Sequence, residues 1–338
     1  MDCTHKPVMK IIFVHQGLGT FVAKDLEILR ERYDVRDLHF HGPRDLFSLW
    51  RGVRWCEMSF CWFCSPHTFF TVLLSKILHK KSVVVAGGYD VANEPEIAYG
   101  VYYGSSLLRR IKQAGSRLTF RLVDLVLAVS RYNMEEALRN ARVKPNKIRL
   151  LYHGFDHNKF KPLEDVKKEP TVLTVGAISH RVIKNKGYGL LMKAAQYLPE
   201  VHFLIVGGWR DDSAYKLRVE APPNVEFTGA LKGVELLRVF SRARVYVQIS
   251  RHESFGCALA EAMLCECIPV ISRRAALPEV AGGCGFYVDE LIPAAVAAKI
   301  KEALSANEGL GKAARERIIV KFPLETRKRE LSYSLNNI

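Results

Sequence analysis

The feature that most constrains the fold is a segment order that occurs twice: an apolar run, a glycine-containing loop and then a helical pattern. In the first copy, residues 11–14 precede Gly17 and Gly19, and in the second, residues 172–175 precede Gly176. Because these runs do not alternate with polar residues, they indicate strands buried on both faces, as in parallel sheets. The other predicted strands cover residues 82–86, 125–129, 202–206, 224–228, 245–249 and 268–271.

Strands that alternate with helices predict the α/β class, and 338 residues are enough for two domains. We therefore expect two doubly wound, Rossmann-like domains that face a cleft. The first domain is predicted over residues 1–160 and the second over residues 171–321. Residues 161–170 are charged, contain Pro162 and Pro170, and are predicted to be the linker.

The chain is basic, with 50 lysine and arginine residues against 35 aspartate and glutamate residues and a formal net charge of +15. The excess is present in both halves, so it does not form a single basic tail. It favours an anionic partner, which can be a nucleotide phosphate, a membrane surface or a nucleic acid. The apolar content of 49% is that of globular proteins and argues against a disordered chain or a collagen.

Eight cysteines are few for this length, and most of them lie in apolar segments, which favours reduced thiols. Cys61 and Cys64 have the spacing of a redox or zinc pair, but the surrounding residues favour a plain apolar strand. No apolar run approaches the length of a membrane span, and the N-terminal run is too short for a signal peptide. We therefore expect a cytoplasmic protein.

The segment 250–263 is the most informative one for chemistry. It follows the strand at 245–249 and is expected to open a helix near Phe255, with Ser254 as its N-cap. The free backbone N–H groups of such a helix start, with Gly256 allowing close approach, suit a diphosphate. Glu253 and Glu261 are too far apart to form a carboxylate pair but can flank a nucleotide sugar. The alternative is a capping loop followed by a solvated glutamate.

A second polar segment, at 184–187, lies in the predicted loop after the strand at 172–175. Lys184 and Lys186 can neutralise a phosphate there, and Gly187 starts the next helix. The alternative is that both lysines are simply solvated.

Together these segments resemble retaining glycosyltransferases of the GT-B fold, family four. The segment from Glu253 to Glu261 has the spacing of that family's E-x7-E element. Other segments resemble the family in the same order between about residues 10 and 333: 124–130, 151–156 with Phe160 and Pro162, 175–187, 225–229 and 277–280.

This resemblance implies transfer of a sugar from a nucleotide-sugar donor to a hydroxyl acceptor, with the anomeric configuration retained. The acceptor can be a glycan, a lipid-linked sugar or a small molecule, and the donor is expected to be a UDP- or GDP-sugar. The first domain would be the acceptor side and the second the nucleotide-sugar side, with a C-terminal helix over residues 322–338 crossing back onto the first. No cofactor is expected, and because the chain has no Asp-x-Asp motif, no metal bridge to the diphosphate is expected either.

The resemblance also assigns roles to residues. Glu253 would contact the transferred sugar, Glu261 the ribose, and Lys186 the departing phosphate. The remaining donor-binding residues would be Gly17 and Gly19 in the N-terminal glycine loop, Gly229 near the base, and the backbone of Phe255, Gly256, Cys257 and Ala258.

The chain departs from the family pattern at three places. His153 stands where the family has an asparagine. Ala177 stands where the family has an arginine, so Arg181 or Lys184 would have to supply that charge. A histidine that many members carry in the first domain is absent, and Asp90 is our candidate for the acceptor-side catalytic carboxylate. The alternative for Asp90 is a turn residue that caps its own loop.

Residues 105–122 form a predicted amphipathic helix with leucines on one face and arginines and lysines around them. Such a helix can lie on an anionic membrane, which would make the protein peripheral on the cytoplasmic face. The alternative is an ordinary helix whose leucines pack on the sheet.

Two other functions stay open. A nucleotide-sugar epimerase of the same fold would act on the donor without an acceptor. A nucleic-acid-binding protein would explain the basic charge, although the cations are dispersed and no known nucleic-acid module is recognised. Nucleic acid is therefore not the expected partner.

Overall fold

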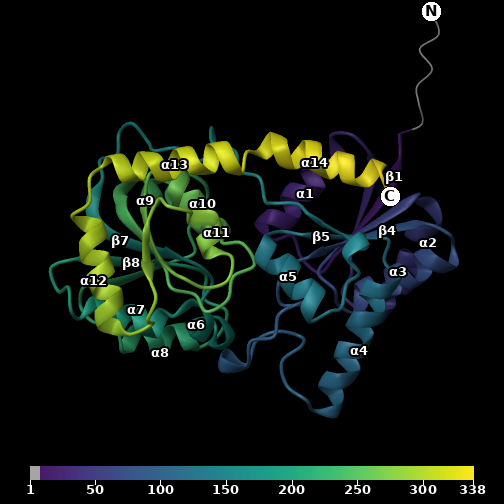
Figure 1. Cartoon of the computed structure of the whole chain (residues 1–338), viewed down its shortest axis with the longest axis horizontal. Helices are drawn as coiled ribbons and strands as arrows, with labels where there is room; N and C mark the ends of the chain where they lie inside the picture. The colour runs from purple at the N-terminus through teal and green to yellow at the C-terminus, as the bar shows by residue number, and fades with distance from the viewer. Residues whose placement is uncertain (1–7) are drawn as a thin grey trace, which may run out of the picture. The chain divides into compact units, whose positions relative to one another are not determined.

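The computed structural model describes residues 8–338 (Figure 1). The chain divides into two compact units. Unit 1 holds the chain up to His153 together with Arg327–Ile338, and unit 2 is Gly154–Thr326.

Unit 1 is built on a six-stranded parallel sheet in the order β2-β1-β3-β4-β5-β6. Its strands are β1 (Lys10–His15), β2 (Asp34–His39), β3 (Met58–Trp62), β4 (Lys81–Ala86), β5 (Leu125–Ala128) and β6 (Ile148–Leu150). Its helices are α1 (Thr20–Arg30), α2 (Leu46–Trp55), α3 (Pro66–Ile77), α4 (Leu107–Leu122) and α5 (Arg131–Arg139), with 3-10 turns η1 (Pro43–Asp45), η2 (Pro95–Ile97) and η3 (Pro145–Lys147). Helix α14 (Leu324–Asn336) belongs to unit 1 from Arg327 onward.

Unit 2 repeats this plan with a parallel sheet in the order β12-β11-β10-β7-β8-β9. Its strands are β7 (Glu169–Val175), β8 (His202–Val206), β9 (Val225–Gly229), β10 (Ala243–Gln248), β11 (Ile268–Ser272) and β12 (Phe286–Val288). Its helices are α6 (His180–Lys186), α7 (Tyr188–Ala195), α8 (Ser213–Val219), α9 (Gly233–Arg242), α10 (Cys257–Leu264), α11 (Leu277–Ala281), α12 (Pro293–Leu304) and α13 (Gly309–Lys321).

Both sheets confirm the predicted fold class of two Rossmann-like domains. Every predicted strand is present to within a few residues, because each central strand is apolar along its length and buried on both faces, as β3 and β11 are throughout. Strand β2 was not predicted: its residues are charged, and as an edge strand it is mostly exposed. The edge strands β6 and β12 were missed because each has only three residues.

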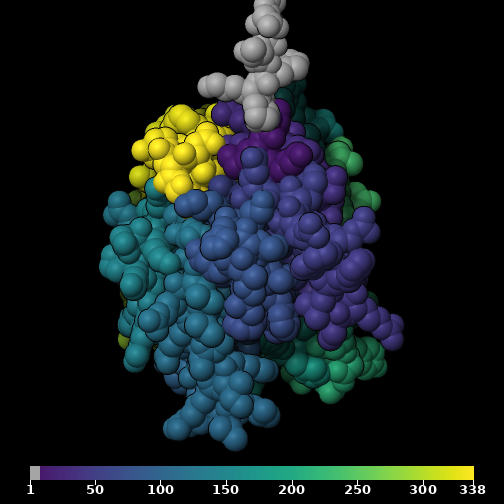
Figure 2. All heavy atoms as spheres, turned by 90° about the vertical axis from the view of Figure 1, so that its right-hand side faces the viewer, coloured from purple at the N-terminus to yellow at the C-terminus, as the bar shows by residue number. Residues whose placement is uncertain are grey.

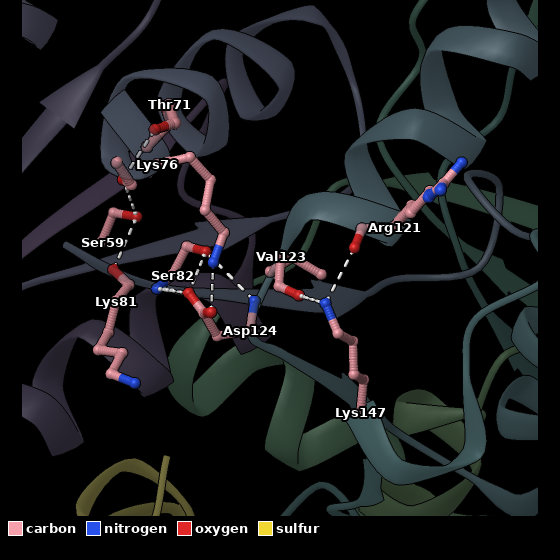
Figure 3. Close-up of polar contacts among 10 residues, drawn as sticks. Ser59, Thr71, Lys76, Lys81, Ser82, Arg121, Val123, Asp124 and Lys147 are labelled. Atoms are coloured by element: carbon pink, nitrogen blue, oxygen red, sulfur yellow. Dashed lines mark hydrogen bonds and ion pairs between the residues drawn. The ribbon is translucent and has the colours of Figure 1, made fainter. Parts of the chain in front are cut away.

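A polar network holds the amino ends of the strands in unit 1 (Figure 3). Asp124 accepts hydrogen bonds from the backbone N–H and the hydroxyl of Ser82, both at 2.9 Å, and pairs with Lys76. The Lys147 ammonium donates to the carbonyls of Arg121 and Val123 at 2.9 and 2.7 Å. The network ties β4 and β5 to α3 and α4 at the edge opposite to the one where ligands bind such sheets.

The domain boundaries differ from the predicted ones. Unit 2 begins at Gly154, before the predicted domain end at residue 160, and it includes the segment 161–170 that was predicted as a linker. The reason is tertiary: Arg315 of α13 donates to the carbonyls of His157 and Phe160, and Lys168 donates to three carbonyls of the unit 2 core. The predicted C-terminal helix at 322–338 is α14, and only Arg327–Ile338 belongs to unit 1.

The cysteines of the described chain are free thiols, and Cys3 lies outside the described residues. Cys61 lies in β3 and Cys64 follows it, both buried, and burial raises the pKa of each thiol to about 12. This agrees with the apolar-strand interpretation of the pair. Among the helices of residues 8–338, none is long and apolar enough to cross a membrane.

Candidate active site

The strand order fixes where each unit can bind a ligand. In unit 2, the chain adds β8 and β9 on one side of β7 and then β10, β11 and β12 on the other. The loops that follow β7 and β10 therefore diverge at the carboxyl edge of the sheet, which leaves a crevice at this switch point. The two segments singled out in the sequence, 184–187 and 250–263, follow these two strands.

The segment after β7 is partly helical, which corrects the expectation of a loop. Helix α6 covers His180–Lys186, and its first N–H, that of His180, donates to Asp211 at 3.0 Å. Asp211 follows β8, so no local pattern revealed this cap. Gly187 joins α6 to α7 in the left-handed region, with φ 71°, and a Cβ there would lie 3.0 Å from the Ile249 carbonyl oxygen. Glycine thus lets the two loops approach each other.

Lys186 and Glu253 form the centre of the site. The Lys186 ammonium lies 2.5 Å from Oε1 of Glu253, and the Ser250 hydroxyl donates to the same oxygen at 3.0 Å. Both side chains are less than one fifth exposed. Burial is the largest single effect on Glu253 and opposes its ionisation, but the charge of Lys186 and the hydrogen bonds from Lys186 and Ser250 together outweigh it and lower the pKa of the carboxyl. Glu253 is therefore ionised at neutral pH.

Asn185 holds the two loops together, a role that was not predicted for it. Its side-chain oxygen accepts from the His252 N–H at 2.9 Å, and its side-chain nitrogen donates to the His252 carbonyl at 3.0 Å. Its own carbonyl accepts from the Arg251 N–H at 2.8 Å. In the sequence Asn185 is a lone asparagine between two lysines, and this pattern does not indicate a buried amide.

Helix α10 begins at Cys257, so the expected N-cap at Ser254 is wrong. Gly256 is the N-cap residue, with φ 104°, and a Cβ there would lie 3.0 Å from Leu277. The Phe255 side chain is buried and its ring stacks with that of Phe155 at 5.8 Å. At 255 and 256 only backbone groups are thus available to a ligand, and the N–H groups of Cys257 and Ala258 open the helix.

Glu261 lies in the second turn of α10, on a different element from Glu253, and is only partly exposed. Burial raises the pKa of its carboxyl from an ordinary 4.5 to about 7, against a smaller opposing effect of Lys159. A carboxyl in this state releases its proton readily when a hydrogen-bond donor arrives.

The other residues assigned to unit 2 are less closely associated with the pair. Arg181 and Lys184 are exposed on α6. Gly229 ends β9 with φ 77°, and its carbonyl accepts from the Gly207 N–H at 2.8 Å.

The remaining predicted residues lie in unit 1, at the corresponding edge of its sheet. Its switch point lies between β1 and β3. Gly17 and Gly19 follow β1, where the Gly17 N–H donates to Nδ1 of His15 at 3.1 Å and Gly19 is the N-cap of α1.

Asp90 is buried, and its carboxylate accepts from the backbone N–H groups of Cys64 and Gly88 at 2.8 Å and of Gly87 at 3.4 Å. Burial raises the pKa of Asp90 against these bonds. The bonds from Gly87 and Gly88 are those of the turn residue considered as the alternative, and the bond from Cys64 joins this loop to the segment after β3.

Two family models match the chain one after the other. Glycosyltransferase Family 4 matches residues 11–159, and Glycosyl transferases group 1 matches residues 169–306. The chain belongs to the family-four glycosyltransferases. This confirms the resemblance on which the predicted class was based.

Curated relatives of this glycosyltransferase are distant. A phosphatidylinositol N-acetylglucosaminyltransferase subunit of Arabidopsis thaliana is 25% identical over 224 residues, which cover 63% of this chain and 47% of the relative. Mannosylfructose-phosphate synthase of Agrobacterium fabrum is 28% identical over 171 residues, covering 43% and 37%. The chain spans less than half the length of these relatives.

Solved structures resemble this glycosyltransferase over nearly its whole length. HepE of Anabaena, solved with UDP-glucose, has a TM-score of 0.80 at 17% identity and covers 98% of this chain and 100% of its own. Sucrose-phosphate synthase of Thermosynechococcus elongatus has a TM-score of 0.76 at 19% identity, covering 97% and 98%. These likenesses place the glycosyltransferase in the GT-B fold.

Proposed function

We propose that the protein transfers a sugar from a nucleotide-sugar donor to a hydroxyl acceptor, with retention of the anomeric configuration and without a metal ion. The observation that carries this proposal is the Lys186–Glu253 pair at the switch point of unit 2, beside the start of α10. A buried cation next to the start of a helix is what a diphosphate leaving group requires.

In this proposal Lys186 moves from Glu253 to the donor diphosphate, and Glu253 then accepts hydrogen bonds from the sugar hydroxyls. Glu261, ionised as it binds, accepts from the ribose. The N–H groups of Cys257 and Ala258 contact the diphosphate, and Arg181 or Lys184 adds positive charge. Gly229 lies near the base, and Gly17 and Gly19 lie in the glycine loop of unit 1.

The transfer forms a bond between the acceptor oxygen and the anomeric carbon, while the bond from that carbon to the phosphate oxygen breaks. The nucleoside diphosphate leaves with the electron pair, and the hydroxyl proton passes to the departing phosphate. Fixed donors stabilise the charge that develops there, which is the main contribution to the rate. We do not assign a proton-transfer step to Asp90, because its carboxylate already accepts from Gly88 of its own loop and from Cys64 after β3.

The printed names of similar proteins guide the choice of substrates. HepE of Anabaena was solved with UDP and UDP-glucose, so UDP-sugars are the first donors to test, followed by GDP-sugars. Relatives are named for phosphatidylinositol, for a sugar phosphate and for a diphospho-undecaprenol-linked acceptor. These names support testing lipid-linked acceptors alongside soluble sugars.

The test is product analysis with UDP-, GDP- and ADP-sugars in the presence of EDTA. We expect transfer with EDTA present, and an anomeric proton coupling in the product that matches the donor configuration. An inverted linkage would contradict retention, and loss of transfer in EDTA would contradict metal independence. If an epimerised sugar forms from the donor alone, the activity is epimerisation and not transfer. Salt-sensitive DNA binding without nucleotide-sugar binding would also overturn the proposal.

We also propose that the protein is peripheral on the cytoplasmic face of a membrane, through α4. The apolar residues of this helix are exposed: Leu107 by 75%, Leu108 by 73%, Ile111 by 60% and Leu118 by 44%. These residues do not pack on the sheet, although Leu122 at the end of the helix packs against the core of unit 1. The buried side of α4 carries Ser116, Thr119 and Phe120. Figure 2, which faces unit 1, shows this helix projecting at the lower end of the view.

Sedimentation with vesicles tests this surface. We expect binding to vesicles with anionic lipid, weakened by salt, and loss of binding in the double variant Leu108→Asp, Ile111→Asp. Equal binding of that variant would contradict the proposal. Val320→Asp, an exposed apolar residue of α13, is the matched control.

A further inference from the structure

Unit 1 contains a cavity of about 800 Å³ that no step of the proposed donor chemistry uses. It lies at the carboxyl edge of the sheet, beside the switch point, because its wall includes Gln16 after β1 and Ser65 after β3. The Ser65 hydroxyl donates to the side-chain oxygen of Gln16 at 3.2 Å and so closes the sheet side of the cavity. Ligands of parallel sheets bind at this kind of place.

The walls of the cavity are largely apolar. Phe63, Phe69 and Phe70 line one side, and Val101 and Leu108 line the other. A cavity with such walls binds hydrocarbon more favourably than it binds a sugar ring, whose hydroxyls would find few partners.

The charged groups of the cavity are two cations and one occupied carboxylate. Arg109 and Lys112 reach it from α4, and Asp90 is the carboxylate among its lining residues. The Arg109 guanidinium is fixed in place, since it donates to the Tyr103 carbonyl at 3.0 Å and lies 3.9 Å from the Tyr103 ring centre. Because Asp90 is bound to three backbone N–H groups, the two cations are left to an anionic ligand.

The cavity continues into the exposed apolar surface of α4. Leu108 both lines the cavity and is 73% exposed, and Leu107 and Ile111 beside it are exposed by 75% and 60%. A hydrocarbon chain longer than the cavity can therefore leave it along α4 without entering water.

We infer that this cavity is the acceptor site and that the acceptor is an amphiphile in which a long alkyl chain is joined to a phosphate. The alkyl chain occupies the aromatic wall and the face of α4, and the phosphate binds Arg109 and Lys112. This inference rests on the proposed function, which supplies the donor and the transfer step, and it adds the chemical class of the acceptor.

Calorimetric titration with dodecyl phosphate below its critical micelle concentration tests the ligand class. Dodecyl maltoside and inorganic phosphate test the chain and the anion separately. We expect dodecyl phosphate to bind about tenfold or more tightly than either, because only it satisfies both halves of the site. If dodecyl maltoside binds as tightly as dodecyl phosphate, the cavity is an unspecific detergent site. If inorganic phosphate binds as tightly, it is only an anion site. Either result overturns the inference.

Two variants locate the binding in the cavity. A Cβ on Gly115, which lines the cavity, would meet no atom within 4 Å, so Gly115→Leu fills the cavity without a clash and also removes a glycine from a helix. We expect this variant to fold and to lose dodecyl phosphate binding. Ala114→Leu, the exposed neighbour on α4, is its control and should bind as the wild type does.

Lys112→Ala should weaken dodecyl phosphate binding about fivefold, the usual effect of one solvent-accessible charge. Arg110→Ala removes the same charge from the same helix outside the cavity and serves as its control. Equal effects of the two variants would mean that general surface charge, and not the cavity, holds the phosphate, and would overturn the inference.

UDP binding and donor turnover are measured in the same wild-type preparation. Donor turnover with soluble sugars but no dodecyl phosphate binding overturns this inference and leaves the proposed function standing. Dodecyl phosphate binding without any nucleotide binding overturns the proposed function instead.

Discussion

At the scale of single residues, Lys186 and Glu253 neutralise each other before any donor is bound. Their contact at 2.5 Å joins two side chains that are both largely buried. In the proposed function, a donor diphosphate replaces Glu253 as the partner of Lys186, and Glu253 then becomes available to the sugar. The free protein would thus hold the proposed catalytic groups in a paired arrangement.

A double-mutant cycle measures this pair. Lys186→Met leaves the Glu253 carboxylate without its cation and should lower the free energy of unfolding by about 1–3 kcal/mol. Adding Glu253→Gln should recover part of that loss, while transfer stays reduced by at least about 100-fold in all three variants. Lys193→Met, an exposed lysine on α7, is the control. Strictly additive stability effects would contradict the pairing, and wild-type turnover of Lys186→Met would contradict its role at the phosphate.

Glu261 gives a second prediction at this scale, because its pKa of about 7 lies above the ordinary 4.5. The folded state holds this proton more tightly than the unfolded state, so the stability contribution is complete below about pH 4.5 and is lost as the pH rises through 7. Glu261→Gln, which stays neutral, should therefore be more stable than the wild type at pH 8, by on the order of 1–3 kcal/mol, and equally stable at pH 4.5.

Urea unfolding of Glu261→Gln at both pH values, together with nucleotide binding, checks this prediction. The same variant should bind UDP more weakly, because it cannot become an anionic acceptor for the ribose. Glu316→Gln, exposed on α13, is the control and should change neither quantity. A variant less stable than the wild type at pH 8 would show that the carboxylate is well solvated or paired.

At the scale of elements, the site is two loops tied together by one amide. The Asn185 side chain satisfies both the N–H and the carbonyl of His252, which places the 250–253 loop against the end of α6. The Ser272 hydroxyl supports the same loop from β11 by donating to the Ser250 carbonyl at 2.6 Å. The distance between Lys186 and Glu253 thus depends on α6, β10 and β11 together.

Asn185→Leu should leave both His252 groups unsatisfied and lower the free energy of unfolding by about 1–3 kcal/mol. Amide exchange should accelerate in residues 250–256 but not in β7 or β10, and kcat should fall more than the affinity for UDP. Asn224 is a matched control, since its amide donates to the carbonyls of Ala195, Leu198 and Val201 at 2.9–3.1 Å outside the site. If Asn224→Leu lowers kcat as strongly as Asn185→Leu does, the fall in kcat reflects a general loss of structure and not the position of Asn185 in the site.

At the scale of the whole molecule, three buried histidines link stability to pH. Burial lowers the pKa of His15, His67 and His153, that of His67 to about 4. The unfolded chain binds protons at these positions near pH 6.5 while the folded chain does not. The contribution of these histidines to stability is therefore complete above about pH 6.5 and falls as the pH is lowered, by up to about 1.4 kcal/mol per pH unit for each histidine.

Urea unfolding between pH 7 and 5 checks this slope, with His67→Gln as the variant. Its stability should fall less steeply than that of the wild type, by about 1 kcal/mol per pH unit. His79→Asn is the control, because His79 is exposed and its left-handed φ of 53° suits asparagine. Identical slopes in His67→Gln and the wild type would mean that His67 is protonated in the folded state.

The C-terminal helix is held to unit 1 by a buried ion pair. The Arg327 guanidinium donates two hydrogen bonds of 2.7 Å to Asp25, and both side chains are at most 2% exposed. Arg327→Met should destabilise the protein by about 3–5 kcal/mol, whereas the double variant with Asp25→Leu should be much milder. Thermal unfolding of both measures this, and a double variant as unstable as Arg327→Met would contradict it.

The central elements could be predicted from the sequence because their signal is local. Residues 11–14 and 172–175 are apolar and uninterrupted, and they form the first strand of each sheet. The segments around Lys186 and Glu253 follow the buried strands β7 and β10, so the residues of the proposed donor site could be found as well. Strand β2 could not be predicted, because it is an exposed edge strand. The cap of α6 could not be predicted either, because Asp211 belongs to a different loop.

The sequence by itself determined the class of the fold, the family and the residue types at the proposed donor site, because periodicity and motif spacing are properties of neighbouring positions. The tertiary structure alone decided which groups meet. It paired Lys186 with Glu253 and Asn185 with His252, 67 positions apart in each case, and it bound Asp25 to Arg327 across 302 positions. It also turned the leucines of α4 outward, a choice that helical periodicity leaves open because it fixes a shared face and not the side on which the rest of the molecule packs.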